Sequence, residues 1–405
     1  MNRRRKRLKL FLYFFEMNIR LFGEGGGDKC VDLLVYFYRN ASEAAFVTKP
    51  TKRKGGINMK RKGYPISLIV LTVVVVLGFV LPATGISKVV MKCGSISPTQ
   101  HPEFAGLTIF KKIVEEKTNK EIEVQIFPSG QLGAHRAMTE QVQSGAIQMA
   151  LIGNAALSRF VPQAIITDLP FAFPNRRILY EVLDSEIREK AFSYFPSKGL
   201  KALEWSENDF RDITNSKRVI KRPEDLKGLK LRVMESPLYI DAFKALGAEA
   251  VPMAMTEVYS ALQQGVIDGQ ENALWFSMMM KLCEVNKFVT ISGHTFTGTV
   301  QIVNLDFWNR LPKRNQDILA EAAHESLLVS RGNFPQMRAE ALEKARGMGV
   351  QVYELTPKEK EVFRVALKPV WAKCRETVGA DLFDSFVAKI DEVTKKIEEA
   401  SRMKK

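Results

Sequence analysis

The chain has 405 residues, of which 46% are hydrophobic and 26% charged, a balance typical of a globular protein large enough for two lobes. Its formal net charge of +15 would suggest nucleic acid or an anionic membrane as a partner. The first 62 residues, however, hold sixteen Lys and Arg against five Asp and Glu, a surplus of +11. The rest of the chain therefore carries only +4, which removes the main support for nucleic-acid binding.

An apolar run over Pro65–Leu81 follows the basic residues 60–62 and ends in Pro82-Ala83-Thr84-Gly85. This order predicts a secretory signal peptide over 59–85, cleaved after Gly85, and export to the periplasm. A transmembrane anchor is the alternative, although a run of seventeen residues is at the short end of the spanning range. Because the signal begins at Met59, residues 1–58 are interpreted as an upstream artefact of the gene boundary, with a real cytoplasmic extension as the alternative.

The four cysteines do not form a paired framework. Cys30 precedes the signal, so Cys93, Cys283 and Cys374 remain after processing. These three allow at most one disulfide, and buried free thiols are expected instead. The sequence contains no metal-binding signature, and we expect neither a metal nor a cofactor.

After the signal, strands and helices are predicted to alternate. The spacing of apolar residues predicts amphipathic helices, and short runs of alternating or continuous apolar residues predict strands. Such alternation indicates βα units and a mostly parallel sheet. A long helix late in the chain would be able to bridge two lobes. The predicted helices are 103–117, 136–144, 238–246, 256–264, 312–348 and a helical stretch over 357–401; the predicted strands are 122–127, 146–152, 229–233 and 250–253.

Catalytic signatures are absent from the sequence after the signal. Its four histidines, His101, His135, His294 and His324, are scattered over different predicted elements. No G-x-S-x-G, Walker A or H-E-x-x-H pattern is present. The absence of these patterns argues against an exported enzyme that acts on an organic acid, and a binding protein is favoured instead. A chemosensory or scaffold protein is a further alternative.

Arg232 is the best candidate for a binding residue. It lies near the end of an apolar predicted strand, between Leu231 and Val233, and α/β folds place ligands at such strand ends. An Arg there can hold a carboxylate through two parallel hydrogen bonds. The alternative is an edge Arg paired with Glu235 or Asp268.

Other polar or aromatic residues also follow predicted strands. The segment Asp268–Asn272 offers carboxylate and amide groups next to a glycine, although an ordinary polar turn is the alternative. Asn154 follows the strand predicted over 146–152, and Trp275 follows the 268–272 segment. We expect both to line a binding cleft.

Several long motifs closely resemble the solute-binding subunits of tripartite ATP-independent periplasmic (TRAP) transporters of the DctP type. The resemblance runs from about Val89 to about Ile390. The motifs that carry it are FPSGQLG (127–133), DLPF (168–171), FRDITNS (210–216), PEDLKGLKLRV (223–233) and EVYSALQQGVIDGQEN (257–272).

The resemblance implies an α/β fold of the type II periplasmic-binding-protein kind. Two lobes, each a mixed and mostly parallel sheet flanked by helices, would close over ligand about a hinge, and a long helix would span both. We expect lobe I to comprise 86–208 and 298–337, and lobe II to comprise 209–297 and 338–405.

The resemblance also implies roles for individual residues. Arg232 would clamp the ligand carboxylate, Arg211 would assist it, and Asn272 would hydrogen-bond the ligand. Met255 stands at a cleft-lining position that is often aromatic in the family, and Gly293 replaces an Asn that often precedes His294.

The expected ligand is a small organic carboxylate. Two Arg near one cleft favour a C4-type dicarboxylate. A sugar acid, keto acid or other monocarboxylate is the alternative, using one Arg and leaving the second structural. The expected partners are the small and large membrane subunits of a TRAP transporter, and the chain is expected to be a monomer.

Overall fold

The computed structural model describes residues 88–403. The predictions made for residues 1–58, for the signal peptide over 59–85 and for Cys30 lie outside these residues. Between residues 88 and 403, no helix is long and apolar enough to cross a membrane. Cys93, Cys283 and Cys374 are free and buried, which confirms the expected thiols.

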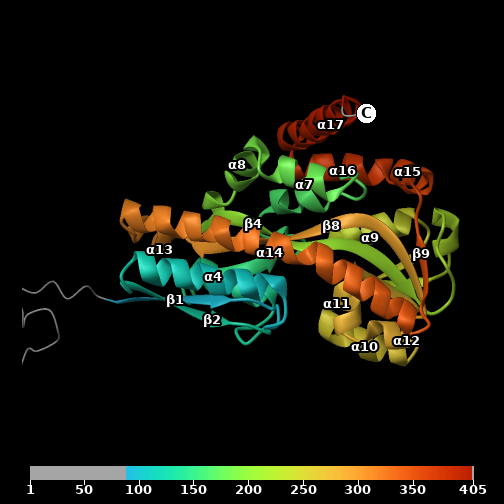
Figure 1. Cartoon of the computed structure of the whole chain (residues 1–405), viewed down its shortest axis with the longest axis horizontal. Coiled ribbons are helices and arrows are strands. Elements are labelled where there is room, and N and C mark those ends of the chain that lie inside the picture. The colour runs from blue at the N-terminus through green and yellow to red at the C-terminus, as the bar shows by residue number, and fades with distance from the viewer. Residues whose placement is uncertain (1–87, 404–405) are drawn as a thin grey trace, which may run out of the picture. The chain divides into compact units, whose positions relative to one another are not determined.

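The described chain forms a two-lobed α/β fold around a sheet of nine strands (Figure 1). The strands follow the order β2-β1-β3-β8-β4-β7-β5-β6, and β9 pairs with β8. Pairing is parallel at both ends of the sheet, where β1 meets β2 and β3 and where β5 meets β6 and β7. It is antiparallel in the middle, between β3 and β8 and between β4 and its neighbours β7 and β8. The strands are β1 Val89–Gly94, β2 Ile122–Phe127, β3 Met149–Gly153, β4 Leu200–Asn215, β5 Lys230–Val233, β6 Glu249–Pro252, β7 Gly269–Ala273, β8 Phe288–Asn304 and β9 Gln351–Glu354.

Two long central strands run through both lobes. The first half of β4 pairs with the end of β8, and its second half pairs with β7 and with the beginning of β8. The β4–β8 register shifts between Glu207 and Phe210, where Asp209 takes a left-handed backbone with φ of 72°. Arg176 and Arg338 both form ion pairs with the buried Asp209 carboxylate. This polar bulge lies at residue 209, where the boundary between the lobes is expected in β4.

The long helix α14 crosses both lobes, as Figure 1 shows. It packs against α4 in the first lobe and against α11 in the second. Arg331 and Arg338 lie on either side of Pro335 in this helix, and they bind the residue that ends α7 and a residue of β4, respectively. Arg331 holds both oxygens of Asp184 at 2.7 and 2.9 Å, and Arg338 Nη2 lies 2.9 Å from an oxygen of Asp212.

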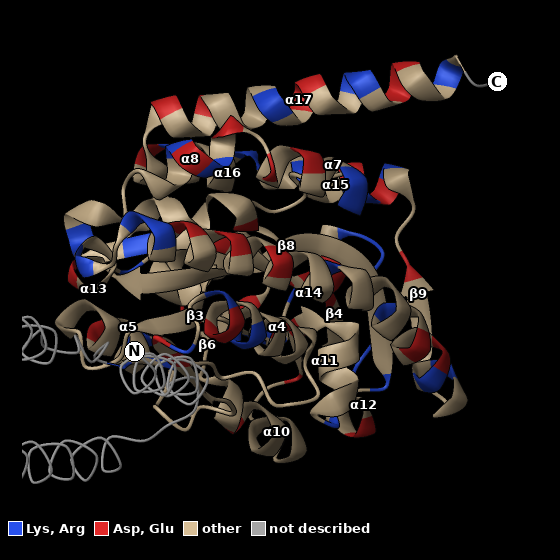
Figure 2. Ribbon diagram, turned by 60° about the vertical axis from the view of Figure 1, so that its left-hand side comes forward, with Lys and Arg blue, Asp and Glu red and all other residues tan. Residues whose placement is uncertain are grey.

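Helices cover both faces of the sheet. The last three helices pack on elements of both expected lobes, because α16 contacts α9 while α17 contacts α7 and α8. Figure 2 shows Lys and Arg interspersed with Asp and Glu along α17, in keeping with the small charge surplus after residue 62. The helices are α4 Pro102–Lys117, α5 His135–Ser144, α6 Asn154–Leu157, η1 Pro162–Asp168, α7 Arg176–Leu183, α8 Glu186–Phe192, η2 Pro196–Lys198, η3 Pro223–Leu226, α9 Pro237–Ala245, α10 Met255–Gln263, α11 Leu274–Met279, α12 Leu282–Val285, α13 Leu305–Arg310, α14 Lys313–Gly347, α15 Pro357–Ala366, α16 Lys368–Val378 and α17 Ala380–Arg402.

Most predicted elements agree with this structure. The strand over 122–127 has the predicted bounds, and the long helix at 312–348 is α14. The strand predicted over 146–152 begins only at Met149, since the preceding residues form the turn after the left-handed Gly145. The helical stretch over 357–401 is three helices, separated at Leu367 and Gly379. The division of the chain into lobes at residues 209, 298 and 338 stays a prediction, and α17 packs on helices of expected lobe I.

A matched pair of glycine substitutions tests how α4 and α14 pack. A Cβ on Gly106 of α4 would lie 2.5 Å from the Ser326 carbonyl oxygen of α14, whereas a Cβ on Gly332 of α14 would meet nothing within 4 Å. Gly106→Ala should lower the free energy of unfolding by about 2 kcal/mol through overpacking. Gly332→Ala should raise it by about 0.5–1 kcal/mol, because Ala favours the helix. Urea unfolding measures the free energy of unfolding of both variants. A change of the same sign in the two variants would contradict the packing described here.

Candidate functional site

Most of the polar residues predicted from the sequence meet in one buried region, where the strand ends of the two lobes face each other. β4, β5, β7 and α9 supply residues from expected lobe II, and η1 and α6 supply residues from expected lobe I. The region is called the arginine cluster below. Its members are Arg211, Arg232, Glu271, Asn272, Tyr239, Asp168 and Asn154, each less than a tenth exposed.

Arg211 of β4 is held by Glu271 of β7. Its Nε and Nη2 donate to the two carboxylate oxygens, with 2.9 Å between Nη2 and Oε1, and Nη2 also donates to the Glu271 carbonyl. Its Nη1 donates to Asn272 Oδ1 at 3.1 Å and to Thr297 Oγ1 at 3.4 Å. Burial opposes charge on Glu271, but Arg211 and His294 outweigh it and hold the pKa of Glu271 below its usual range. Arg211 is therefore neutralised and hydrogen-bonded on every side.

Arg232 of β5 has a different environment. Its Nε donates to the Met253 carbonyl at 2.8 Å, while Nη1 is buried and has no partner among residues 88–403. The side chain is 4% exposed, and burial lowers the pKa of Arg232 to about 10, with Glu271 opposing this and Arg211 adding to it. A buried guanidinium nitrogen without a partner is costly, and an anion placed there would satisfy it. The predicted alternative, a pairing with Glu235 or Asp268, is not formed: neither carboxylate makes an ion pair with Arg232 in the described chain.

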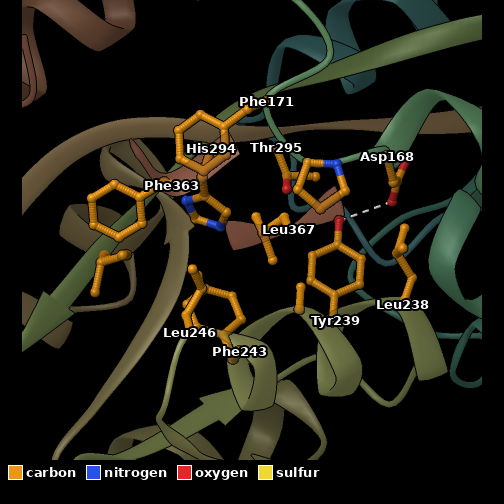
Figure 3. Close-up of a pocket in the computed structure, with 13 residues that line it drawn as sticks. Asp168, Phe171, Leu238, Tyr239, Phe243, Leu246, His294, Thr295, Phe363 and Leu367 are labelled. Carbon is orange, nitrogen blue, oxygen red and sulfur yellow. Dashed lines mark hydrogen bonds between the residues drawn. The ribbon is translucent and has the colours of Figure 1, made fainter. Parts of the chain in front are cut away.

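Asp168 connects the two lobes through Tyr239. The Tyr239 hydroxyl of α9 donates to Asp168 Oδ2 at 2.9 Å, drawn as a dashed line in Figure 3. Asn154 Nδ2 donates to the other oxygen at 3.0 Å, and the Arg211 guanidinium lies 5.6 Å from the centre of the Tyr239 ring. Burial raises the pKa of Asp168 to about 7, although Asn154, Tyr239 and Arg211 favour its charged form. Asn154 Oδ1 is buried and has no partner in the described part of the chain.

The remaining predicted residues divide between two places. Met255 is half-buried at the start of α10, and Asn272 Nδ2 donates to its Sδ at 3.6 Å, so it borders the arginine cluster. Trp275 packs elsewhere: its ring meets His101 edge-on at 4.8 Å and lies 5.9 Å from Phe334 of α14. Its Nε1 is buried without a partner among residues 88–403. No described contact joins Trp275 to either arginine.

An apolar pocket adjoins the arginine cluster behind Tyr239 and His294 (Figure 3). Phe171, Phe243 and Phe363 form much of its wall. The free volume is about 10 Å³, which is the space of a single water molecule and too small for an organic acid. The pocket as it stands therefore holds no organic acid.

Sequence reasoning missed three members of this region as site residues. Glu271 and Asp168 lie within the motifs 257–272 and 168–171, and Tyr239 lies in the helix predicted over 238–246, but the sequence assigns none of the three a role of its own. The signal for Tyr239 was its hydroxyl, since a buried Tyr usually needs a hydrogen-bond partner. Among residues 88–403, no group of three or more His, Cys, Asp or Glu could hold a metal ion.

Known proteins share this fold and these motifs. Residues 93–377 match the family described as bacterial extracellular solute-binding protein, family 7 (DctP). A solute-binding protein of Verminephrobacter eiseniae is 35% identical over 73% of this chain and 88% of its own length. The C4-dicarboxylate-binding periplasmic protein DctP of Rhodobacter capsulatus is 30% identical over 76% of this chain and 95% of its own length. The crystal structure of a TRAP periplasmic solute-binding protein from Polaromonas, bound to D-erythronate, matches with a TM-score of 0.69 and 33% identity, over 74% of this chain and 98% of that one.

The two-lobed α/β fold is the fold of periplasmic solute-binding proteins. The chain belongs to the DctP family of extracellular solute-binding proteins, which serve TRAP transporters. Proteins of this family bind solutes for transport and are not enzymes.

The raised pKa of Asp168 predicts a pH dependence of stability. Between pH 4 and 7 the folded protein keeps a proton on Asp168 that the unfolded chain has released, so the free energy of unfolding falls as pH rises through this window. Asp168→Asn should remove about 3 kcal/mol of that fall. Urea unfolding of both proteins at pH 4.5 and 7.5 measures the difference. An equal fall in the two proteins would contradict the assignment.

Proposed function

We propose that this protein captures a small organic carboxylate outside the cytoplasmic membrane and delivers it to the membrane subunits of a TRAP transporter. The observation that carries the proposal is the buried Nη1 of Arg232, which has no partner within the described chain. The guanidinium is fixed by the bond from Nε to the Met253 carbonyl, and Arg232 is the last residue but one of β5. Planar guanidinium groups bind carboxylates with two hydrogen bonds, so an acid fits this group best.

Asn272 and Asn154 would complete the site from the two lobes. Asn272 uses its oxygen to accept from Arg211, and its amide donor makes only a weak contact with Met255 sulfur. Asn154 has the opposite arrangement, because its amide is bonded to Asp168 and its oxygen is unpaired among residues 88–403. One lobe thus offers a hydrogen-bond donor and the other an acceptor, and a solute held by both would favour lobe closure.

Two ligand classes follow from the family. The Rhodobacter capsulatus relative is named for C4-dicarboxylates, which supports the dicarboxylate predicted from the sequence. The Polaromonas relative holds D-erythronate, which supports the alternative of a hydroxylated monocarboxylate. The mature protein is proposed to be periplasmic and monomeric, with its precursor exported by the segment at 59–85.

Removal of the Arg232 guanidinium tests the proposal. A ligand at 100 times its Kd stabilises the folded state by about 2.7 kcal/mol, so a thermal-shift screen of organic acids should reveal at least one stabilising acid. Arg232→Ala should weaken binding of that acid by about 100-fold or more, because the carboxylate loses its charged partner. Without ligand, the variant should melt close to the wild-type temperature, because Arg232 forms no ion pair in the described chain.

Arg310→Ala is the matched control. Arg310 is exposed at the end of α13 and lies outside the arginine cluster, so this variant should bind as the wild type does. Near-normal affinity in Arg232→Ala would refute the carboxylate clamp. Consumption of the acid by the wild-type protein would refute the transport function in favour of an enzyme.

A further inference from the structure

The balance of charge in the arginine cluster carries an inference about the ligand, and it rests on the function proposed above for the same site. The prediction of a dicarboxylate from the sequence assumes that Arg211 and Arg232 are both available to the ligand. In the structure the two arginines are not equivalent. Arg211 has both of its carboxylate contacts with Glu271, whereas Arg232 contacts only a backbone carbonyl.

We infer that the natural ligand is a hydroxylated acid with one carboxylate, such as an aldonate, and that the site discriminates against dicarboxylates. Arg232 supplies one unneutralised cation for one carboxylate. Glu271 cancels the charge of Arg211, and Asp168 adds a buried negative charge beside Tyr239 once the pH exceeds its pKa of about 7. A second ligand carboxylate would have to displace Glu271 or lie near Asp168 without a cation, and an unpaired buried charge is strongly disfavoured.

Two uncharged groups that follow strands of the two expected lobes are also unsatisfied in the described chain. Asn154 Oδ1 and Ser236 Oγ are buried without partners among residues 88–403. Asn154 directly follows the end of β3, and Ser236 lies three residues after the end of β5. An amide oxygen accepts hydrogen bonds, and a serine hydroxyl both donates and accepts them. Ligand hydroxyls match both groups, while a second carboxylate, which only accepts, cannot satisfy Asn154 Oδ1.

Pairs of acids that differ only at the terminal carbon test this inference. D-Erythronate and meso-tartrate differ by a CH₂OH group in place of a carboxylate, and D-galactonate and galactarate differ in the same way at a longer chain length. Binding to the purified protein is measured by titration calorimetry at pH 8, where Asp168, with its pKa of about 7, is ionised. At least one aldonate should bind, and it should bind at least tenfold more tightly than its own dicarboxylate.

The outcomes separate this inference from the function on which it rests. Equal or tighter binding of the dicarboxylate in the pair, or tighter binding of succinate than of either aldonate, would overturn the ligand class and leave carboxylate capture standing. Tighter binding of an acid without hydroxyl groups than of any of the four hydroxylated acids would also overturn the ligand class and leave carboxylate capture standing. Failure of every organic acid to bind would overturn both.

Glu271→Gln tests whether the negative charge of Glu271 causes the preference for an aldonate over its dicarboxylate. Without the carboxylate, Arg211 regains a net charge, so the preference for the aldonate over its dicarboxylate should shrink by about tenfold or more. Glu257→Gln makes the same chemical change at an exposed position of α10 and should keep the wild-type ratio. If Glu271→Gln does not fold, Asp168→Asn removes a different negative charge from the cluster and should shift the ratio in the same direction. An unchanged ratio in the folded variant would overturn the charge-balance argument.

Discussion

The buried ion pair between Arg211 and Glu271 is the interaction on which the rest of the site depends. Both side chains are almost completely removed from water, at 2% and 0% exposure. Such a pair is tolerated only when its remaining hydrogen-bonding capacity is satisfied, and Asn272, Thr297 and His294 provide those contacts. The pair joins β4 to β7 and orients Asn272, and it removes Arg211 from the groups available to a ligand. Arg232 is then left as the single guanidinium with an unsatisfied buried nitrogen in this cluster.

The long strands β4 and β8 bring this pair into the middle of the molecule. Each strand runs through both lobes, so residues of the two lobes meet at fixed positions along the same backbone. At the crossing, the Asp209 bulge is held by arginines from α7 and α14. The Tyr239–Asp168 hydrogen bond joins the two expected lobes at a second point, within the arginine cluster.

Sequence patterns predicted the amphipathic elements and missed the central ones. The strand over 122–127 alternates apolar and polar residues, and its bounds were predicted correctly. β4 gave no such signal, because Glu207, Asp209 and Asp212 interrupt its apolar residues, and these carboxylates are buried only because arginines from distant elements neutralise them. Neutralisation by residues distant in sequence also explains why the site could be predicted only in part. Motifs indicated Arg211, Arg232 and Asn272, but no local pattern shows that Glu271 neutralises one arginine and not the other.

A crystal structure of the protein with a bound acid tests the central claim most directly, which is that the two arginines have separate roles. If the roles are separate, a ligand carboxylate will lie within hydrogen-bonding distance of Arg232 Nη1, and Arg211 will still be bonded to both oxygens of Glu271. A ligand carboxylate that takes the place of Glu271 on Arg211, with Arg232 left uncontacted, would contradict it.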